Sequence, residues 1–284
     1  MSLYARLRAY RHVLISDIDG TLLGGESLAG ESSGGAPGGP AANGSTSTAV
    51  GKALGARLLE KRAALVLASG RNLELSLAAA KELSAAGLPT PTALITGVGS
   101  EIYLCDGDLA DSQQLDHDWT AHLEDGWESE RVTTTLLSVA GLQAQEAQGQ
   151  SPLKASYYLE PSAREPAAVV AAARGALEEA GLAARLIHSA GKLLDVLPAR
   201  ASKGAAVAWL LGRAAIAPQA AITAGDSGND REMLLAEIDG VPLKAVVVAN
   251  HEPELAALTG LRNVYFAERS YAAGVLEGLL AHGW

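Results

Sequence analysis

The chain has 284 residues, of which 48% are hydrophobic and 19% are charged. This composition excludes a disordered chain, and at about 150 residues per domain the length fits one large or two modest domains. With 22 Lys and Arg against 32 Asp and Glu, the net charge is −10. Such a balance argues against a nucleic-acid binder, which needs basic surface, but it allows a small phosphorylated substrate.

The compartment is predicted from the single cysteine, Cys105, which rules out an intrachain disulfide framework. We interpret Cys105 as a small buried hydrophobe and expect a reducing, cytoplasmic environment. The longest apolar stretches, such as Ala63–Ser69 and Lys244–Ala249, have the length of strands rather than of membrane spans. The N-terminus lacks the apolar core of a signal peptide. We therefore expect a soluble intracellular protein with no membrane partner.

The first half of the chain alternates strands and helices. The first strand is expected at His12–Ser16, followed by a Gly/Ser-rich stretch, Gly24–Thr48, which we interpret as a mobile loop. The pattern then predicts a helix over Ala49–Lys61, a strand at Ala64–Ala68, a helix ending at Ala86, a strand at Ala93–Thr96 and a short β segment at Glu101–Leu104.

The middle of the chain has a different pattern. A helix is expected over Trp119–Gln143, a strand at Leu153–Leu159 and an Ala-rich helix at Pro166–Ala180. Two strands, Arg185–His188 and Leu193–Leu197, flank a tight turn that predicts a hairpin. We therefore expect a small α+β cap domain over residues 118–199.

The last part of the chain again alternates strands and helices. It predicts helices at Lys203–Arg213, Asp230–Glu237, Glu252–Leu258 and Ala272–Ala281, and strands at Ala220–Ala224, Lys244–Ala249 and Asn263–Phe266. Strands that alternate with helices indicate an α/β fold with a doubly wound parallel sheet. The core would comprise residues 1–117 and 200–284.

Polar clusters follow several of these strands. They are Asp17 and Asp19, then Ser69-Gly70-Arg71, then Lys203 at a helix start, and then Gly225–Asp230. One such cluster could be a helix cap or a turn. Four clusters in this order indicate a ligand site, because open α/β sheets bind ligands outside the carboxyl ends of their strands.

A chemical argument connects these clusters. Four carboxylates (Asp17, Asp19, Asp226 and Asp230) would repel one another unless a hard cation such as Mg²⁺ lay among them. A carboxylate nucleophile can accept a phosphoryl group, and Lys203 would neutralise charge on that group. The Ser69 hydroxyl and the Gly70 N–H would bind the remaining phosphate oxygens.

With DxDGT, a strand-terminal Ser, a Lys and GDSGND in this order, the sequence resembles the haloacid-dehalogenase-like (HAD) phosphohydrolases. The resemblance implies that Asp17 is the nucleophile and that Asp19 is the general acid and base. It implies that Ser69, Gly70, Lys203 and Asn229 hold the phosphate, and that Asp17, the Asp19 carbonyl and Asp226 ligate Mg²⁺ with support from Asp230.

The segments ITGVGSEIY, LKASYYL, SAGKLLDVLP and AGDSGNDREML look like the sucrose-phosphate phosphatase branch, in which a cap lies between the second and third motifs. The chain departs from that branch at Gly20 and Leu22, where Asn and Trp are usual, and after Lys192, where only Asp195 of the usual acidic pair remains. The resemblance implies a Mg²⁺-dependent phosphatase acting on a sucrose 6-phosphate-like disaccharide phosphate. The alternatives are a mannosylfructose-phosphate or other glycosyl or hexose phosphate phosphatase, and a non-catalytic sugar-phosphate-binding module.

The expected sugar contacts are polar or aromatic residues of the cap, together with one core residue: Glu101, Lys154, Tyr157, Ser189, Lys192 and Asp195. From spacing alone, a solvated sheet face explains the cap residues equally well. The resemblance favours Lys192 and Asp195. The expected partner is a small-molecule sugar phosphate, and a disaccharide-phosphate synthase is the candidate protein partner.

Overall fold

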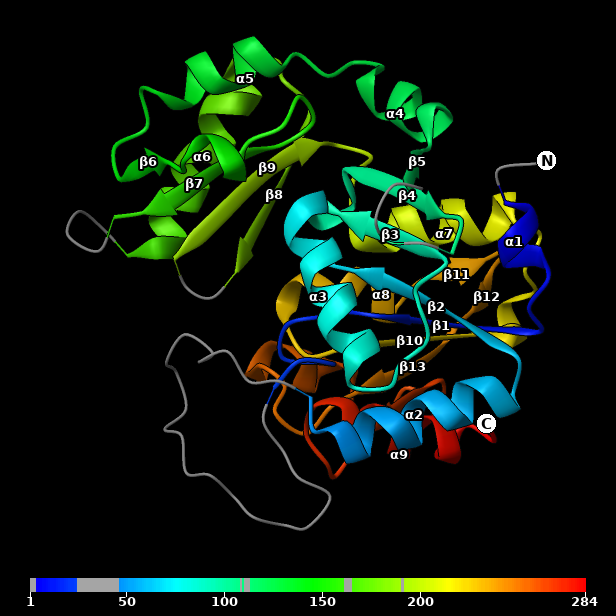
Figure 1. Cartoon of the computed structure of the whole chain (residues 1–284). Coiled ribbons are helices and arrows are strands. Elements are labelled where there is room, and N and C mark those ends of the chain that lie inside the picture. The colour runs from blue at the N-terminus through cyan, green and yellow to red at the C-terminus, as the bar shows by residue number, and fades with distance from the viewer. Residues whose placement is uncertain (1–3, 25–45, 108, 110–112, 161–164, 190–191) are drawn as a thin grey trace.

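The computed structural model describes residues 4–24, 46–107, 109, 113–160, 165–189 and 192–284. These residues are arranged around two main sheets, of eight and four strands (Figure 1). The larger sheet has the strand order β14-β13-β10-β1-β2-β3-β4-β5. Its strands are β1 (His12–Ser16), β2 (Ala63–Ala68), β3 (Ala93–Thr96), β4 (Glu101–Cys105), β5 (Gln113–Leu115), β10 (Ala221–Gly225), β13 (Lys244–Val247) and β14 (Val264–Phe266).

The six strands from β14 to β3 run parallel, whereas β4 and β5 add an antiparallel edge. In the centre, Leu14 of β1 pairs with Ile222 of β10 on one side and with Leu65 of β2 on the other. The central strands are almost continuously apolar because helices bury both faces of a parallel sheet. The predicted doubly wound α/β core is confirmed.

Helices cover each face of this sheet (Figure 1). One face packs against α2, α3 and α9, whose buried side chains share a cluster with Leu14 and Leu65. The other face packs against α1, α4, α7 and α8, together with Val13 and Val66. The bounds are α1 (Ala5–Arg8), α2 (Thr48–Glu60), α3 (Leu73–Ala85), α4 (His117–Glu124), α7 (Lys203–Arg213), α8 (Arg231–Leu234) and α9 (Tyr271–Ala281).

The smaller sheet is antiparallel, with the order β6-β7-β9-β8, and forms the cap. Two helices, α5 and α6, pack on one of its faces and enclose a separate apolar cluster. The predicted hairpin is confirmed as β8 and β9. The bounds are β6 (Leu142–Ala144), β7 (Ala155–Leu159), β8 (Ala184–Ser189), β9 (Leu193–Pro198), α5 (Ser129–Leu136) and α6 (Pro166–Glu179).

Three predicted helices are wrong in extent or type. The helix expected over Trp119–Gln143 is divided into α4 and α5, because Asp125 is extended and Gly126 has a φ of +82°. The helix expected over Asp230–Glu237 stops at Leu234, and a short hairpin follows, formed by β11 (Glu237–Ile238) and β12 (Val241–Pro242). The helix expected over Glu252–Leu258 is a 3₁₀ helix at Pro253–Leu258.

Helix α4 belongs with the core in its packing. Its buried residues Trp119 and Leu123 join the core cluster rather than the cluster of the cap. We therefore propose that the cap begins after α4, and not at residue 118. Most of the predicted Gly24–Thr48 loop, residues 25–45, lies outside the described residues.

Two further expectations concern Cys105 and membrane association. Cys105 is buried and free, as predicted, and burial raises the pKa of its thiol to about 11. Within the described ranges, none of the helices is both long and apolar enough to cross a bilayer.

Candidate active site

The site lies where the two central strands end. Strands β1 and β10 are parallel neighbours, so the residues that follow them, Asp17 and Asp226, emerge side by side. The backbone N–H of Asp17 donates to the carbonyl of Ala224 at 3.0 Å, so the pairing of β1 with β10 extends to Asp17. The sheet register therefore determines the separation between these two distant parts of the chain.

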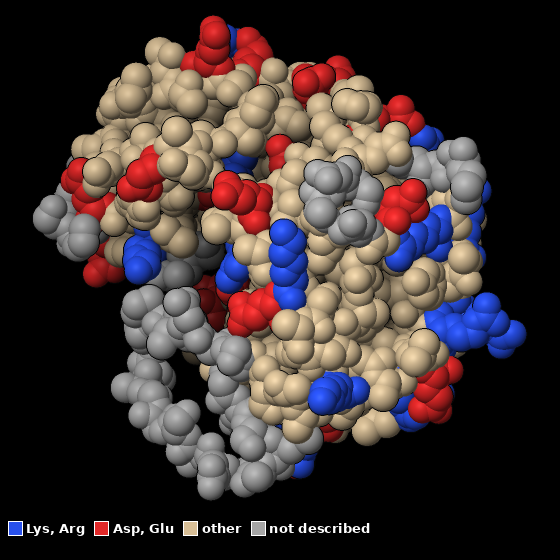
Figure 2. All heavy atoms as spheres, viewed as in Figure 1, with Lys and Arg blue, Asp and Glu red and all other residues tan. Residues whose placement is uncertain are grey.

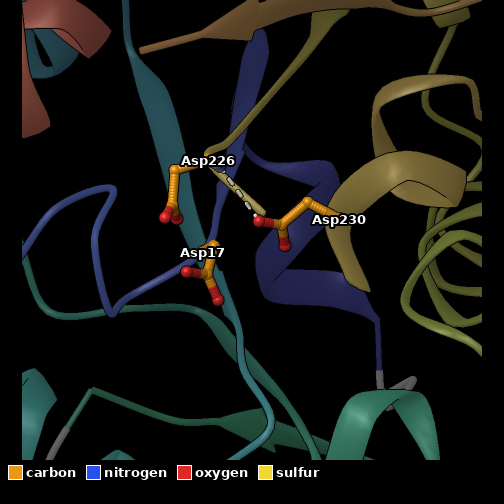
Figure 3. Close-up of side chains that lie close together, drawn as sticks. All are labelled: Asp17, Asp226 and Asp230. Atoms are coloured by element: carbon orange, nitrogen blue, oxygen red, sulfur yellow. Dashed lines mark hydrogen bonds between the residues drawn. The ribbon is translucent and has the colours of Figure 1, made fainter. Parts of the chain in front are cut away.

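Three carboxylates converge at this edge. Asp17, Asp226 and Asp230 each offer an oxygen, and these atoms lie within 4.8 Å of one another. Figure 3 shows the three side chains directed toward a common space. Asp226 is oriented by Thr21, whose hydroxyl donates to its Oδ1 at 2.7 Å. The sequence predicted that four aspartates converge here; three of them do, whereas the carboxylate of Asp19 is not part of the cluster.

Lys203 lies beneath this trio and is itself buried, with 1% of its surface exposed. It is the first residue of α7, which begins at the N-cap Ser202. Its Nζ donates to Asp17 Oδ1 and to Asp230 Oδ1, at 2.6 Å in each case. A buried ammonium needs such partners, because an unpaired buried charge is very costly.

Asp230 organises the loop that carries Asp226. Its Oδ2 accepts the backbone N–H of Asp226 at 3.0 Å and that of Ser227 at 3.1 Å. Since its Oδ1 is bound to Lys203, both of its oxygens already have partners. Asp230 is therefore suited to shaping the site, whereas Asp17 and Asp226 present oxygens toward the pocket.

Burial and neighbouring charges shift the pKa values of these residues. Burial, and next the charge of Asp230, raise the pKa of Asp17 well above its ordinary value despite the opposing effect of Lys203. The same two causes raise the pKa of Asp226 to about 7. Burial acts to lower the pKa of Lys203, but the carboxylates of Asp17 and Asp230 outweigh it and raise that pKa.

These residues fit a divalent cation. The cluster holds three carboxylates against one ammonium, and burial together with the charge of Asp230 raises the pKa values of Asp17 and Asp226. The donors are all oxygen, which suits a hard ion. The expected metal role of Asp17 and Asp226 is thus compatible with the geometry. The carboxylate of Asp19 lies outside this cluster.

A pocket of about 360 Å³ opens over the cluster, between core and cap. Figure 2 shows acidic side chains recessed in the hollow between the two parts, with basic side chains beside it. The lining combines core and cap residues: Asp17, Asp19, Ser69, Gly70, Arg71, Val98, Gln145, Lys154, Leu193, Asp195, Asp226, Ser227, Asn229 and Glu252.

The expected phosphate-binding residues lie around the floor of this pocket. Ser69 is buried at the end of β2, and its Oγ accepts the backbone N–H of Arg71 at 3.1 Å. Gly70 and Asn229 line the pocket directly, and Lys203 lies below it. Helix α3 begins just after this tripeptide, with Asn72 as its N-cap.

Asp19 is held by a residue that we did not single out from the sequence. The Arg71 guanidinium donates to both of its carboxylate oxygens, from Nε at 2.8 Å and from Nη2 at 2.6 Å. Arg71 follows Ser69 and Gly70 directly, so its position in that tripeptide was the available signal. The hydrogen bond from Arg71 to Asp19 is the main cause that raises the pKa of the guanidinium.

Two of the predicted sugar contacts line the pocket. Lys154 and Asp195 come from neighbouring parts of the cap, and the Nζ of Lys154 lies 3.6 Å from Asp195 Oδ1. Ser156 donates to the same oxygen at 2.5 Å. Gln145 and Leu193 are cap residues that also line the pocket, and the sequence pattern did not point to them.

The other predicted sugar contacts are placed elsewhere. Tyr157 is buried in the cap core, because side chains alternate along β7 and Ser156 faces the other side. Glu101 lies in β4, where it accepts hydrogen bonds from Thr96 and Tyr103. Lys192 is exposed beside residues 190–191, which are outside the described residues, as is the side chain of Ser189.

Sequence comparison assigns the family. A model of the sucrose-6F-phosphate phosphohydrolase family matches residues 10–283. The chain belongs to this family. It is 33% identical to mannosylfructose-phosphate phosphatase of Agrobacterium fabrum over 219 residues, which cover 77% of this chain and 82% of that protein. It is 32% identical to sucrose-phosphatase 1 of Nicotiana tabacum over 224 residues, which cover 76% of this chain but only 49% of that protein.

Solved structures agree with the family assignment. The sucrose-phosphatase of Synechocystis, solved with sucrose and phosphate, superposes with a TM-score of 0.76 and 28% identity, over 96% of this chain and 98% of that one. A haloacid dehalogenase-like hydrolase of Bacillus subtilis, with a TM-score of 0.60 and 17% identity, supports the fold alone. This member of the sucrose-6F-phosphate phosphohydrolase family is thus a HAD-type phosphatase, a phosphoric monoester hydrolase.

Proposed function

We propose that the protein is a Mg²⁺-dependent phosphatase that hydrolyses a disaccharide phosphate of the sucrose 6-phosphate type through an aspartyl-phosphate. The observation that carries the proposal is the buried Asp17–Lys203 pair, which lies at the floor of a pocket whose other wall is the polar cap surface. The phosphate would occupy the core side and the sugar the cap side.

Asp17 is the nucleophile of the first step. Lys203 binds Oδ1, so we assign the attack on phosphorus to Oδ2. As the new O–P bond forms, the bond from phosphorus to the sugar oxygen breaks, and Asp19 supplies the proton to that oxygen. Ser69, Gly70 and Asn229 would hold the other phosphate oxygens, with Lys203 balancing their charge.

Water completes the reaction in the second step. Asp19, now a carboxylate, takes a proton from a water molecule, whose oxygen attacks the phosphorus. The bond between Asp17 and phosphorus breaks, which regenerates the Asp17 carboxylate and releases inorganic phosphate. The two steps therefore use Asp19 first as an acid and then as a base.

We assign the divalent cation to Asp17 and Asp226, with the Asp19 carbonyl as a further ligand and Asp230 supporting the loop. When bound, Mg²⁺ would compensate the negative charge of the phosphate and of the two carboxylates. The convergence of oxygens from Asp17, Asp226 and Asp230 within 4.8 Å of one another supports this assignment.

Lys154, Asp195 and Gln145 are the cap residues that we assign to the sugar. They are polar, they line the pocket, and Lys154 and Asp195 lie close enough to act as one donor–acceptor unit. Sugar hydroxyls need such paired groups beside an apolar wall, which Leu193 supplies. Lys192 and Ser189, at the neighbouring turn, remain proposed contacts.

Phosphate release from a panel of sugar phosphates tests this function. Wild-type protein should turn over a disaccharide phosphate with Mg²⁺ and lose activity in chelator. Asp17→Asn, which keeps the shape but not the nucleophile, should lose at least about 10³-fold in kcat. The matched control is Asp125→Asn, an exposed aspartate paired with Arg200 away from the pocket. Full activity of Asp17→Asn, or of wild type in chelator, would refute the mechanism.

A second substrate is favoured by the relationship to mannosylfructose-phosphate phosphatase, of which the alignment covers 82%. Mannosyl and glucosyl groups differ in the orientation of one ring hydroxyl, so the cap must make the distinction. Comparing kcat/KM for the two disaccharide phosphates decides between them. A preference for hexose monophosphates by tenfold, about 1.4 kcal/mol in transition-state binding, would overturn the disaccharide assignment.

We further propose a cytoplasmic location and a disaccharide-phosphate synthase as the protein that supplies the substrate. The single buried thiol, Cys105, fits a reducing compartment. Co-purification with a synthase expressed in the same cells tests the association, and purification of the chain by itself under gentle conditions would argue against a stable complex.

A further inference from the structure

Asp19 and Arg71 form a bidentate ion pair at the mouth of the pocket. Both guanidinium bonds are short, at 2.6 and 2.8 Å, and each reaches a different oxygen of the carboxylate. This arrangement defines the plane of the carboxylate as well as its distance, which a single contact cannot do. Arg71 donates both of the hydrogen bonds that the Asp19 carboxylate accepts within the described part of the chain.

Arg71 is itself held in place from three directions. Its Nη1 donates to the carbonyl of Leu75 at 3.2 Å, and its backbone N–H donates to Ser69 Oγ at 3.1 Å. Its carbonyl accepts the N–H of Gly97 at 2.8 Å. These hydrogen bonds fix the backbone that carries the guanidinium, and only 29% of the Arg71 side chain is exposed.

Asp19 lacks comparable support of its own. Its side chain is 52% exposed, and its carboxylate does not join the trio of Asp17, Asp226 and Asp230. A side chain this open would sample several rotamers without a fixed partner. The Asp19 side chain therefore depends on Arg71 for a fixed conformation.

We propose that Arg71 is a positioning residue that holds the Asp19 carboxylate as the base for hydrolysis of the aspartyl-phosphate. This rests on the proposed function. After Asp19 has given its proton to the leaving oxygen, it is a carboxylate, which is the form that a bidentate guanidinium binds. In this form it must accept a proton from water, so Arg71 acts chiefly on the second step.

An aryl ester separates the two steps. With p-nitrophenyl phosphate, the leaving nitrophenolate is stable without protonation, so the first step does not need Asp19 as an acid. The burst of nitrophenolate then reports transfer to Asp17, and the steady state reports breakdown of the phosphoenzyme. A residue that merely binds phosphate would alter both phases, whereas a residue that positions the base would alter only the second.

The experiment measures both phases with Mg²⁺ for wild type, Arg71→Met, Asp19→Asn and the double variant. Arg71→Lys keeps the charge but not the two-point contact. Arg57→Met is the matched control, because Arg57 forms an ion pair with Glu60 on the surface of α2, away from the pocket. We expect Arg71→Met to keep the burst rate and to lose about 10- to 100-fold in the steady state, less than the roughly 10²- to 10⁴-fold of losing a general base outright, because Asp19 itself is retained.

We also expect phosphoenzyme to accumulate in acid-quenched Arg71→Met, little recovery in Arg71→Lys, and a double variant no slower than Asp19→Asn. Equal losses in both phases would overturn the inference, and so would a double variant far slower than Asp19→Asn. A wild-type chain that forms no phosphoenzyme would overturn the proposed function together with the inference. A normal aryl burst without disaccharide turnover would refute only the substrate class and leave the inference standing.

Discussion

Replacing Lys203 by Met tests the charge balance on which the site depends. The substitution removes the Nζ that lies 2.6 Å from both Asp17 and Asp230 and leaves three clustered carboxylates without a cation. Removing one partner of a buried ion pair costs about 3–5 kcal/mol. At roughly 2–4 °C per kcal/mol for a chain of this size, the melting temperature should fall by about 6–20 °C at pH 8 in chelator.

The same variant should be much less affected at pH 5. The pKa of Asp226 is about 7, so its carboxyl is largely protonated there and Lys203 has less charge to balance; the pKa of Asp17 is raised as well. Loss of Lys203 raises these pKa values further, so between pH 4 and 8 the folded variant binds more protons than its unfolded chain. Its stability therefore falls as pH rises.

Thermal unfolding of wild type and Lys203→Met at pH 5 and pH 8, in chelator, measures this difference. Lys81→Met, on the exposed side of α3, is the control for loss of a lysine. Addition of Mg²⁺ at pH 8 should restore part of the loss, since a second cation would compensate the same carboxylates. A loss equal at both pH values, or no loss at pH 8, would show that the carboxylates are not charge-balanced by Lys203.

Two more substitutions test neighbouring features. The raised pKa of Asp226 makes the stability of the wild type in chelator decline as pH rises from 4 to 7. Asp226→Asn removes this carboxyl, so the stability of the variant should depend less on pH. Parallel pH–stability curves for the two proteins would contradict this. Gly20→Ala places a methyl group 2.3 Å from Asp226 Oδ2 at a φ of +79°. Besides the roughly 1–2 kcal/mol of backbone strain, which lowers stability, the collision should displace Asp226 and so lower kcat. Gly126→Ala is its control, with a φ of +82° and no atom within 4 Å; equal effects of the two on kcat would refute the collision.

The sequence by itself determined the core and which polar residues meet at one edge of its sheet. Short, continuously apolar runs such as His12–Ser16 and Ala221–Gly225 can be buried on both faces only in a parallel sheet. Polar residues directly after such runs must then meet at one edge of that sheet. The positions of Asp17, Asp226 and Lys203 followed from this reasoning and from the resemblance of the motifs.

Tertiary structure decided the cap contacts, because side chains on a strand alternate and the sequence does not reveal which set is buried. In LKASYYL both Ser156 and Tyr157 could face a sugar, and only the packing of α5 and α6 buries Tyr157 and leaves Ser156 beside Asp195. The Asp19–Arg71 pair likewise joins residues 52 positions apart, through the ends of adjacent strands β1 and β2. The sequence places Arg71 directly after Ser69 and Gly70, but only the fold shows that its partner is Asp19.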